Sequence, residues 1–208
     1  MRAILGFLIL CAACSGPSKT GAGGTGGAGG TGGTGGGAPP RNVDRATGLA
    51  AFETVRGVLQ HARCQNCHPA GDTPLQGDEG RLHNQNVRRG PKGEGLVGAE
   101  CTTCHGAANP PASYGRNMPP GNVKGWHMPP PEMKLVFVGM SSRALCEQTK
   151  DPARNGGKDM AALRTHLDDP LVTWGWTPGA GRTPIPTPRT TFLAAWETWA
   201  AAGAPCPE

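Results

Sequence analysis

The sequence is poor in aromatic residues and in charge. Of 208 residues, 5% are aromatic and 17% are charged, which argues against a large, dense core. No apolar run reaches the about 18 residues that an ordinary transmembrane helix needs. The net charge of +5 is not gathered in a block of lysine and arginine. Nucleic-acid binding is therefore not expected.

Two common catalytic signatures are also missing. The chain has no G-x-S-x-G elbow of the hydrolase type and no glycine-rich nucleotide loop after a strand. Glycine, proline and cysteine are abundant instead, with 34, 21 and 8 residues. Glycine and proline together exceed a quarter of the chain, a level that is usual in low-complexity or disordered segments. Their positions therefore decide how much of the chain can fold.

The N-terminus has the features of an export signal. Arg2 supplies a positive charge, Ile4–Leu10 is a short apolar segment, and Ala13-Cys14 resembles the site where a lipoprotein precursor is cut before a lipidated cysteine. We expect a lipoprotein signal peptide over residues 1–13 and lipidation of Cys14. The alternative is a plain secretory signal. In both cases the mature chain is exported, and the first predicts a lipid anchor on the periplasmic side of a bacterial membrane.

A low-complexity segment follows the signal. Gly21–Gly37 contains only glycine, threonine and alanine, so it has almost no apolar side chain to bury and predicts a flexible coil. We expect a glycine-rich tether over residues 14–40 and a folded domain over residues 41–208. Much of the glycine excess then belongs to the tether.

Two pentapeptides dominate the domain: Cys64-Gln65-Asn66-Cys67-His68 and Cys101-Thr102-Thr103-Cys104-His105. Each is a C-x-x-C-H sequence, the attachment signature of c-type haem. The two thiols add across the two vinyl groups of one haem, and the following histidine binds the iron from the proximal side. The sequence therefore predicts two covalent haem c groups. Their predicted anchors are Cys64, Cys67, Cys101 and Cys104, and their predicted proximal iron ligands are His68 and His105.

Two alternatives use the same cysteines without haem. A zinc site could take all four thiolates, but 33 residues separate Cys67 from Cys101, which exceeds the usual spacing between zinc-binding pairs. Two disulfides are conceivable outside the cytoplasm. A bond within C-x-x-C is, however, strained and reactive for a structural role. Neither alternative explains a histidine after both pairs.

A low-spin haem that carries electrons needs a second axial ligand, usually His or Met. The candidates are His61, His83, His127, His166, Met118, Met128 and Met133. We favour His127 and His83, followed by Met118 and then Met128. Pro129 extends the backbone before it, so His127 and Met128 should point to opposite sides. His166 is assigned to a helix surface or the edge of the core.

The remaining patterns predict a mainly α fold with long irregular loops rich in proline and glycine, as in a small cytochrome c-like dihaem domain. Helices are expected near residues 44–61, 142–148, 159–167 and 190–202, and a strand at 134–138. If the first helix continued, His61, Cys64 and His68 would share one face. The buried side of the last helix would consist of Phe192, Trp196 and Trp199. Cys146 and Cys206 are the expected disulfide partners.

The chain also resembles a known family over about residues 52–207. The matching stretches are 52–56, 61–69, 86–90, 118–121, 126–130, 151–157 and 203–207. They are similar to those of bacterial dihaem c-type cytochromes that are often labelled isoquinoline 1-oxidoreductase subunit. The label implies an electron-transfer subunit that serves a molybdenum hydroxylase. The catalytic subunit is excluded, because the chain has no plant-type C-x4-C-x2-C run and is too short.

These observations together predict an exported, membrane-tethered dihaem cytochrome that relays single electrons. Its expected partners are redox proteins, among them a molybdenum hydroxylase as donor and a respiratory acceptor. An electron-transfer role is favoured over catalysis. One alternative is a dihaem peroxidase-like enzyme with one open iron position. The other is a non-haem structural lipoprotein held by zinc or disulfides.

Overall fold

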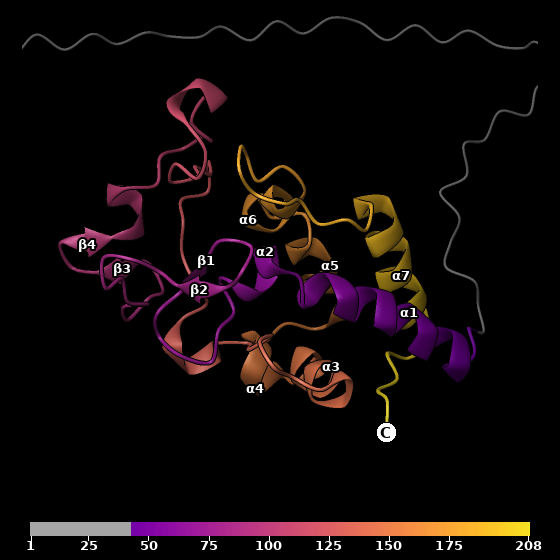
Figure 1. Ribbon diagram of the computed structural model, residues 1–208. Coiled ribbons are helices and arrows are strands. Elements are labelled where there is room, and N and C mark those ends of the chain that lie inside the picture. The colour runs from indigo at the N-terminus through magenta and orange to yellow at the C-terminus, as the bar shows by residue number, and fades with distance from the viewer. Residues whose placement is uncertain (1–42) are drawn as a thin grey trace, which may run out of the picture. The chain divides into compact units, whose positions relative to one another are not determined.

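The computed structural model describes residues 43–208. The predicted signal peptide, Cys14 and the predicted tether lie outside the described residues. Within them, helix accounts for 41% and strand for 5%, so the prediction of a mainly α fold is confirmed. Figure 1 shows α1 and α7 side by side at one end of the domain and the β3–β4 hairpin at the other end.

Helix α1 (Arg45–Leu59) begins where the sequence predicts. Asp44 caps it, since its carboxylate accepts a hydrogen bond from the Thr47 backbone N–H at 2.7 Å. The apolar residues Phe52, Val55, Val58 and Leu59 recur at helical spacing and are buried on one side of the helix. The helix ends at Gln60, two residues before α2 (Ala62–Gln65) begins.

Helix α7 (Arg189–Ala201) packs along α1 and completes the core. Phe192, Trp196 and Trp199 have at most 2% of their surface exposed, so their predicted burial is confirmed. The Phe52 and Trp199 rings lie 4.9 Å apart. A Cβ atom on Gly48 would lie 2.4 Å from the Ala202 Cβ, so this contact between the ends of α1 and α7 requires glycine.

Shorter helices lie between α1 and α7 in the chain order. They are α3 (Ser142–Lys150), α4 (Pro152–Asn155), α5 (Met160–His166) and α6 (Pro170–Thr173). Three 3-10 turns precede α3, and a fourth follows α6: η1 (Cys101–Thr103), η2 (Ala112–Tyr114), η3 (Pro131–Met133) and η4 (Trp174–Trp176). Side-chain oxygens of Ser141 and Asp159 cap α3 and α5. A disulfide joins Cys146 of α3 to Cys206, with 5.5 Å between their Cα atoms. This is the pairing that the sequence predicts.

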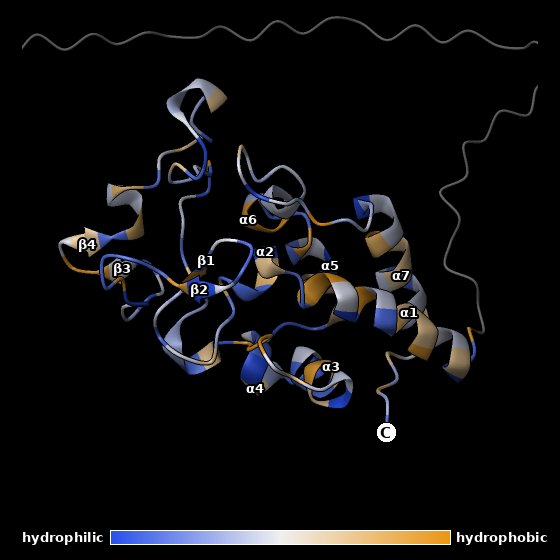
Figure 2. Cartoon of the chain, viewed as in Figure 1, coloured by the Kyte–Doolittle hydropathy of each residue, from blue (hydrophilic) through white to orange (hydrophobic). Residues whose placement is uncertain are grey.

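Two small antiparallel hairpins make up the strand content. Strand β1 (Leu75–Gln76) pairs with β2 (Arg81–Leu82), and β3 (Gly95–Leu96) pairs with β4 (Ala99–Glu100). Figure 2 shows hydrophobic colouring at the tip of the β3–β4 hairpin, and Val97 there is 99% exposed. Both hairpins lie in the chain between the two C-x-x-C-H motifs, so they position the second motif relative to the first.

Two sequence predictions about the fold are wrong in detail. Residues 134–138 form no strand, because Leu135 has a φ of +46° and the Leu135 carbonyl accepts from a histidine ring instead of a neighbouring strand. The last helix begins at Arg189, one residue before the expected start at 190, and its N-cap residue is Pro188. Proline fixes φ near the helical value, which allows a start without a side-chain cap.

Candidate functional site

The first C-x-x-C-H motif begins in α2, at a break in the helical path. His61 is extended, with φ −74° and ψ 148°, and its ring Nδ1 accepts from the Arg63 backbone N–H at 3.2 Å. The first helix therefore does not run on into the motif, so the condition for a shared face of His61, Cys64 and His68 is not met. His61 caps α2, and it is absent from the lining of the cavity beside the motif.

His68 is held at two sides of its ring. Its Nδ1 donates to the Leu135 carbonyl oxygen at 2.8 Å, since a carbonyl can only accept. The ring also stacks on Phe137, with centroids 4.1 Å apart and planes 17° from parallel. A metal-binding histidine typically donates one ring N–H to a backbone carbonyl, which leaves Nε2 unprotonated for the metal. Burial lowers the pKa of His68 to about 4, so the ring is neutral at pH 7.

A cavity of about 290 Å³ adjoins this motif, close to the roughly 300–1,000 Å³ typical of ligand pockets. Cys64, Cys67 and His68 all line it. Most other lining groups are apolar, from α1, α5, α6 and α7; they include Val58, Leu59, Leu163, Leu167, Leu171, Val172, Phe192 and Trp196. A thiol pair, a neutral imidazole and an apolar wall are what a c-type haem requires. The residues of the first motif therefore fit one.

The thiols of the first motif are protonated. Burial raises the pKa of Cys64 to about 12 and that of Cys67 to about 11. Redox-active C-x-x-C pairs have a lowered thiol pKa, so these two do not resemble a dithiol–disulfide centre. All four cysteines of the motifs carry free thiols, whereas Cys146 and Cys206 are bonded.

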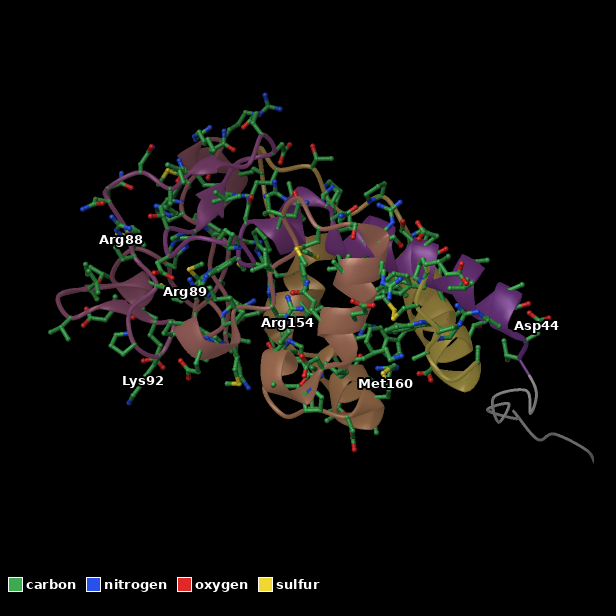
Figure 3. All side chains as sticks on the ribbon, turned by 90° about the horizontal axis from the view of Figure 1, so that it is seen from below. Asp44, Arg88, Arg89, Lys92, Arg154 and Met160 are labelled. Carbon is green, nitrogen blue, oxygen red and sulfur yellow. A yellow bond between two sulfur atoms is a disulfide. The ribbon has the colours of Figure 1, made fainter. Side chains whose placement is uncertain are left out.

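Buried arginines hold the loops around this motif. Arg89 is 1% exposed and donates to the carbonyl oxygens of Gly71, at 2.9 Å, and Pro129. It thereby ties the loop after the first motif to the segment that carries His127. Figure 3 shows Lys92 at the periphery of the molecule and Arg89 nearer its middle. Arg89 is thus a structural tie and not part of a basic surface.

The second C-x-x-C-H motif begins directly after β4, in η1. His105 repeats the anchoring of His68, because its Nδ1 donates to the Pro120 carbonyl oxygen at 2.7 Å. Burial lowers the pKa of His105, which favours the neutral ring. The loop that carries Pro120 approaches closely: a Cβ atom on Gly121 would lie 1.9 Å from the Ala108 carbonyl oxygen. Both motif histidines therefore have the tautomer that metal binding requires.

The second motif lies in a more open setting than the first. Cys104 is exposed and Cys101 is half-buried. Trp126 packs beside His105, with ring centroids 5.2 Å apart. His83, at the end of the β1–β2 hairpin, has its ring centroid 6.2 Å from that of His105. Of the predicted distal ligands, His83 is thus the one that the structure brings to the second motif.

The two motifs are neighbours in space. Burial is the main cause that raises the pKa of Cys67, and the Cys101 thiol is the next. Cys101 belongs to the second motif, 34 positions further along the chain. A negative charge on Cys101 disfavours a second negative charge on Cys67, and at ordinary ionic strength such repulsion is felt only within about 10 Å. Two haems at these motifs would therefore be adjacent.

The other predicted distal ligands are distributed unevenly. His127 and Met128 both line the first cavity, and the expectation that their side chains point to opposite sides stays a prediction. Met118 is 39% exposed and lies beside Arg182 in a separate small hollow, not in the first cavity.

His166 also lines the first cavity, together with Met133. Burial is the main cause that lowers the pKa of His68, the hydrogen bonds to the Leu135 and Lys134 carbonyls raise it, and the charge of His166 lowers it further. The sequence assigns His166 to a helix surface or the edge of the core. Its exposed position at the end of α5, one residue before buried Leu167, agrees with that assignment.

The donor arrangement bears on the zinc alternative. In the part of the chain that the structure describes, no three His, Cys, Asp or Glu side chains converge as a metal site. Structural zinc takes four such ligands, whereas haem iron takes at most two from the protein.

No helix among residues 43–208 has the length and apolar character needed to cross a membrane. Comparisons with family models, curated proteins and solved structures found no match to this chain.

Proposed function

We propose that residues 41–208 form a dihaem c-type cytochrome that relays single electrons between redox proteins. The observation that carries the proposal is the shared anchoring of His68 and His105. Each histidine follows a C-x-x-C pair and donates its Nδ1–H to a backbone carbonyl, at 2.8 Å and 2.7 Å. This leaves Nε2 free on both rings, as iron ligation requires.

The chain contributes attachment, orientation and exclusion of water. Haem supplies a carrier that gains and loses one electron at a time. Cys64 and Cys67 would hold it in the first cavity, where apolar walls exclude water; Cys101 and Cys104 would hold a second one in the more open setting. In each attachment the S–H bond adds across a vinyl C=C bond, so no oxidant is consumed. The hydrogen bonds that the two proximal imidazoles donate to the carbonyls of Leu135 and Pro120 raise the basicity of these rings.

Export and anchoring complete the proposal. Attachment of c-type haem outside the cytoplasm agrees with the signal proposed for residues 1–13 and with the Cys146–Cys206 disulfide. Lipidation of Cys14 would hold the protein at a membrane. The proposed partners are a molybdenum hydroxylase as electron donor and a respiratory acceptor, as the family resemblance implies.

A haem count tests the proposal directly. The protein, purified after expression with a c-type maturation system, is expected to give two haems per chain in a pyridine haemochrome assay and a mass increase of two haems. The double variant Cys64→Ala/Cys67→Ala should keep one haem, and so should Cys101→Ala/Cys104→Ala. Co-purification from the native membrane tests the partners. A wild-type chain without covalent haem would overturn the function.

A further inference from the structure

The rings of His83 and His105 lie near each other at a defined separation. Their ring centroids are 6.2 Å apart and their planes are inclined by 57°. This separation is too long for stacking and too long for a direct hydrogen bond. Two imidazoles that bind one transition-metal ion from opposite sides, each at about 2.0–2.1 Å, have centroids roughly 6 Å apart. The spacing is therefore that of two axial ligands.

His83 is oriented in the same way as the motif histidines. Its Nδ1 donates to the Asn84 carbonyl oxygen at 2.8 Å, just as the Nδ1 of His105 donates to the Pro120 carbonyl oxygen. In both rings Nε2 is the nitrogen that remains for a metal. His83 is thus in the tautomer that a distal ligand needs.

The β1–β2 hairpin fixes His83 in place. The His83 backbone N–H donates to the Pro74 carbonyl oxygen at 2.9 Å, next to the paired residues Leu75 and Leu82. Two residues after His83 the chain turns away, since Gln85 and Asn86 have positive φ values of 62° and 52°. Because the backbone of His83 is already held in place, this residue would lose little conformational entropy on binding iron.

The donor count identifies what could lie between the rings. Among the described residues, no third His, Cys, Asp or Glu joins His83 and His105 as a metal site. A bare cation would therefore have only two protein ligands. Haem iron needs only two, since the porphyrin nitrogens fill its other four positions. The adjacent Cys101 and Cys104 thiols supply the attachment points for that haem.

We propose that His83 is the distal iron ligand of the second haem, opposite His105, so that this haem has a closed bis-histidine site. The inference rests on the proposed dihaem function. A closed site leaves no open position for a small ligand, which favours electron transfer over peroxidase-like chemistry. Because Cys104 is exposed, this haem is the one through which the domain exchanges electrons with partners.

The test removes His83 and then supplies its ring again. His83→Gly is expected to keep two covalent haems, to convert one of them to a high-spin form that binds CO when reduced, and to return to a low-spin spectrum on addition of free imidazole. His61→Asn is the matched control. It also removes a half-buried histidine, but keeps a side-chain acceptor for the cap of α2, and both of its haems should keep their wild-type spectra.

The outcomes separate the inference from the function. If His83→Gly has two haems and an unchanged low-spin spectrum, the inference is overturned and the dihaem function stands. If wild-type protein has no covalent haem, the function itself fails. If His83→Gly does not accumulate, near-infrared magnetic circular dichroism of Cys64→Ala/Cys67→Ala, which keeps only the second haem, decides: a bis-histidine signal is expected, and its absence would overturn the inference.

Discussion

The Cys67 thiol of the first motif lies within electrostatic reach of the Cys101 thiol of the second. Cys67 lines the first cavity, and Cys101 opens η1 after the β3–β4 hairpin. Because each thiol would hold the rim of its own haem, the two rims would be neighbours. Short edge-to-edge separation is what a relay of single electrons between the two haems needs.

Adjacent haems should couple optically. We expect wild-type protein to show a two-signed circular dichroism signal in the Soret region, because the transition dipoles of neighbouring haems interact. The signal should collapse to a single-signed band in Cys101→Ala/Cys104→Ala, which keeps only the haem of the first motif. A two-signed signal of equal size in that variant would contradict the neighbouring placement.

The first haem should depend on His166 for its distal ligand. His166 lines the same cavity as His68, and its charge reaches that ring. We expect His166→Ala to give one high-spin haem that binds CO. Loss of the ligand should also change the reduction potential of that haem. His127→Ala, from the same cavity lining, serves as the control and should stay low-spin. The reverse pattern would assign the ligand to His127.

The disulfide should be a major source of stability. Cys146 and Cys206 are 60 positions apart, and closing a loop of that length in the unfolded chain is worth about 4 kcal/mol in the chain-entropy model. We expect the free energy of unfolding of Cys146→Ser/Cys206→Ser to fall by about this amount, measured by urea denaturation. A loss below about 1 kcal/mol would show that α3 and the C-terminus hold together without the bond.

Arg89 should matter through the loops it ties. Its guanidinium is 1% exposed and donates to the carbonyl oxygens of Gly71 and Pro129. Removing a buried charged donor leaves those acceptors unpaired, so Arg89→Ala should lower the free energy of unfolding by about 3 kcal/mol. Arg88→Ala, at the exposed neighbouring position, should change it by less than about 0.5 kcal/mol. Equal effects would contradict the assignment.

The ion pairs of Asp168 should make stability fall in acid. Hydrogen bonds from Arg164 on α5 and Arg189 on α7 lower the pKa of Asp168 below its usual 3.8. The contribution of these ion pairs to the stability of the fold is therefore complete above about pH 3.8. It is lost as the pH falls through the lower pKa that Asp168 has in the folded state. Thermal midpoints of wild type and Asp168→Asn should differ at pH 6 and converge near pH 2.

Much of the helical scaffold could be predicted from local chemistry. Asp44, Ser141 and Asp159 cap the helices that their positions indicate, because an N-cap interaction involves residues only three positions apart. The apolar side of α7 was also predictable, since Phe192, Trp196 and Trp199 follow helical spacing. The strand expected at 134–138 was not, because Leu135 adopts a positive φ and its carbonyl pairs with a ring 67 positions away.

The sequence by itself determined the chemistry of the candidate site. The spacing of the cysteines and the histidine after each pair are local features, so two attachment motifs were readable without coordinates. Only the tertiary structure decided which groups surround them. The carbonyls of Leu135 and Pro120, the approach of His83 to His105 and the place of His166 in the first cavity all join residues distant in the chain. No local propensity encodes such contacts, because packing of the whole domain sets them.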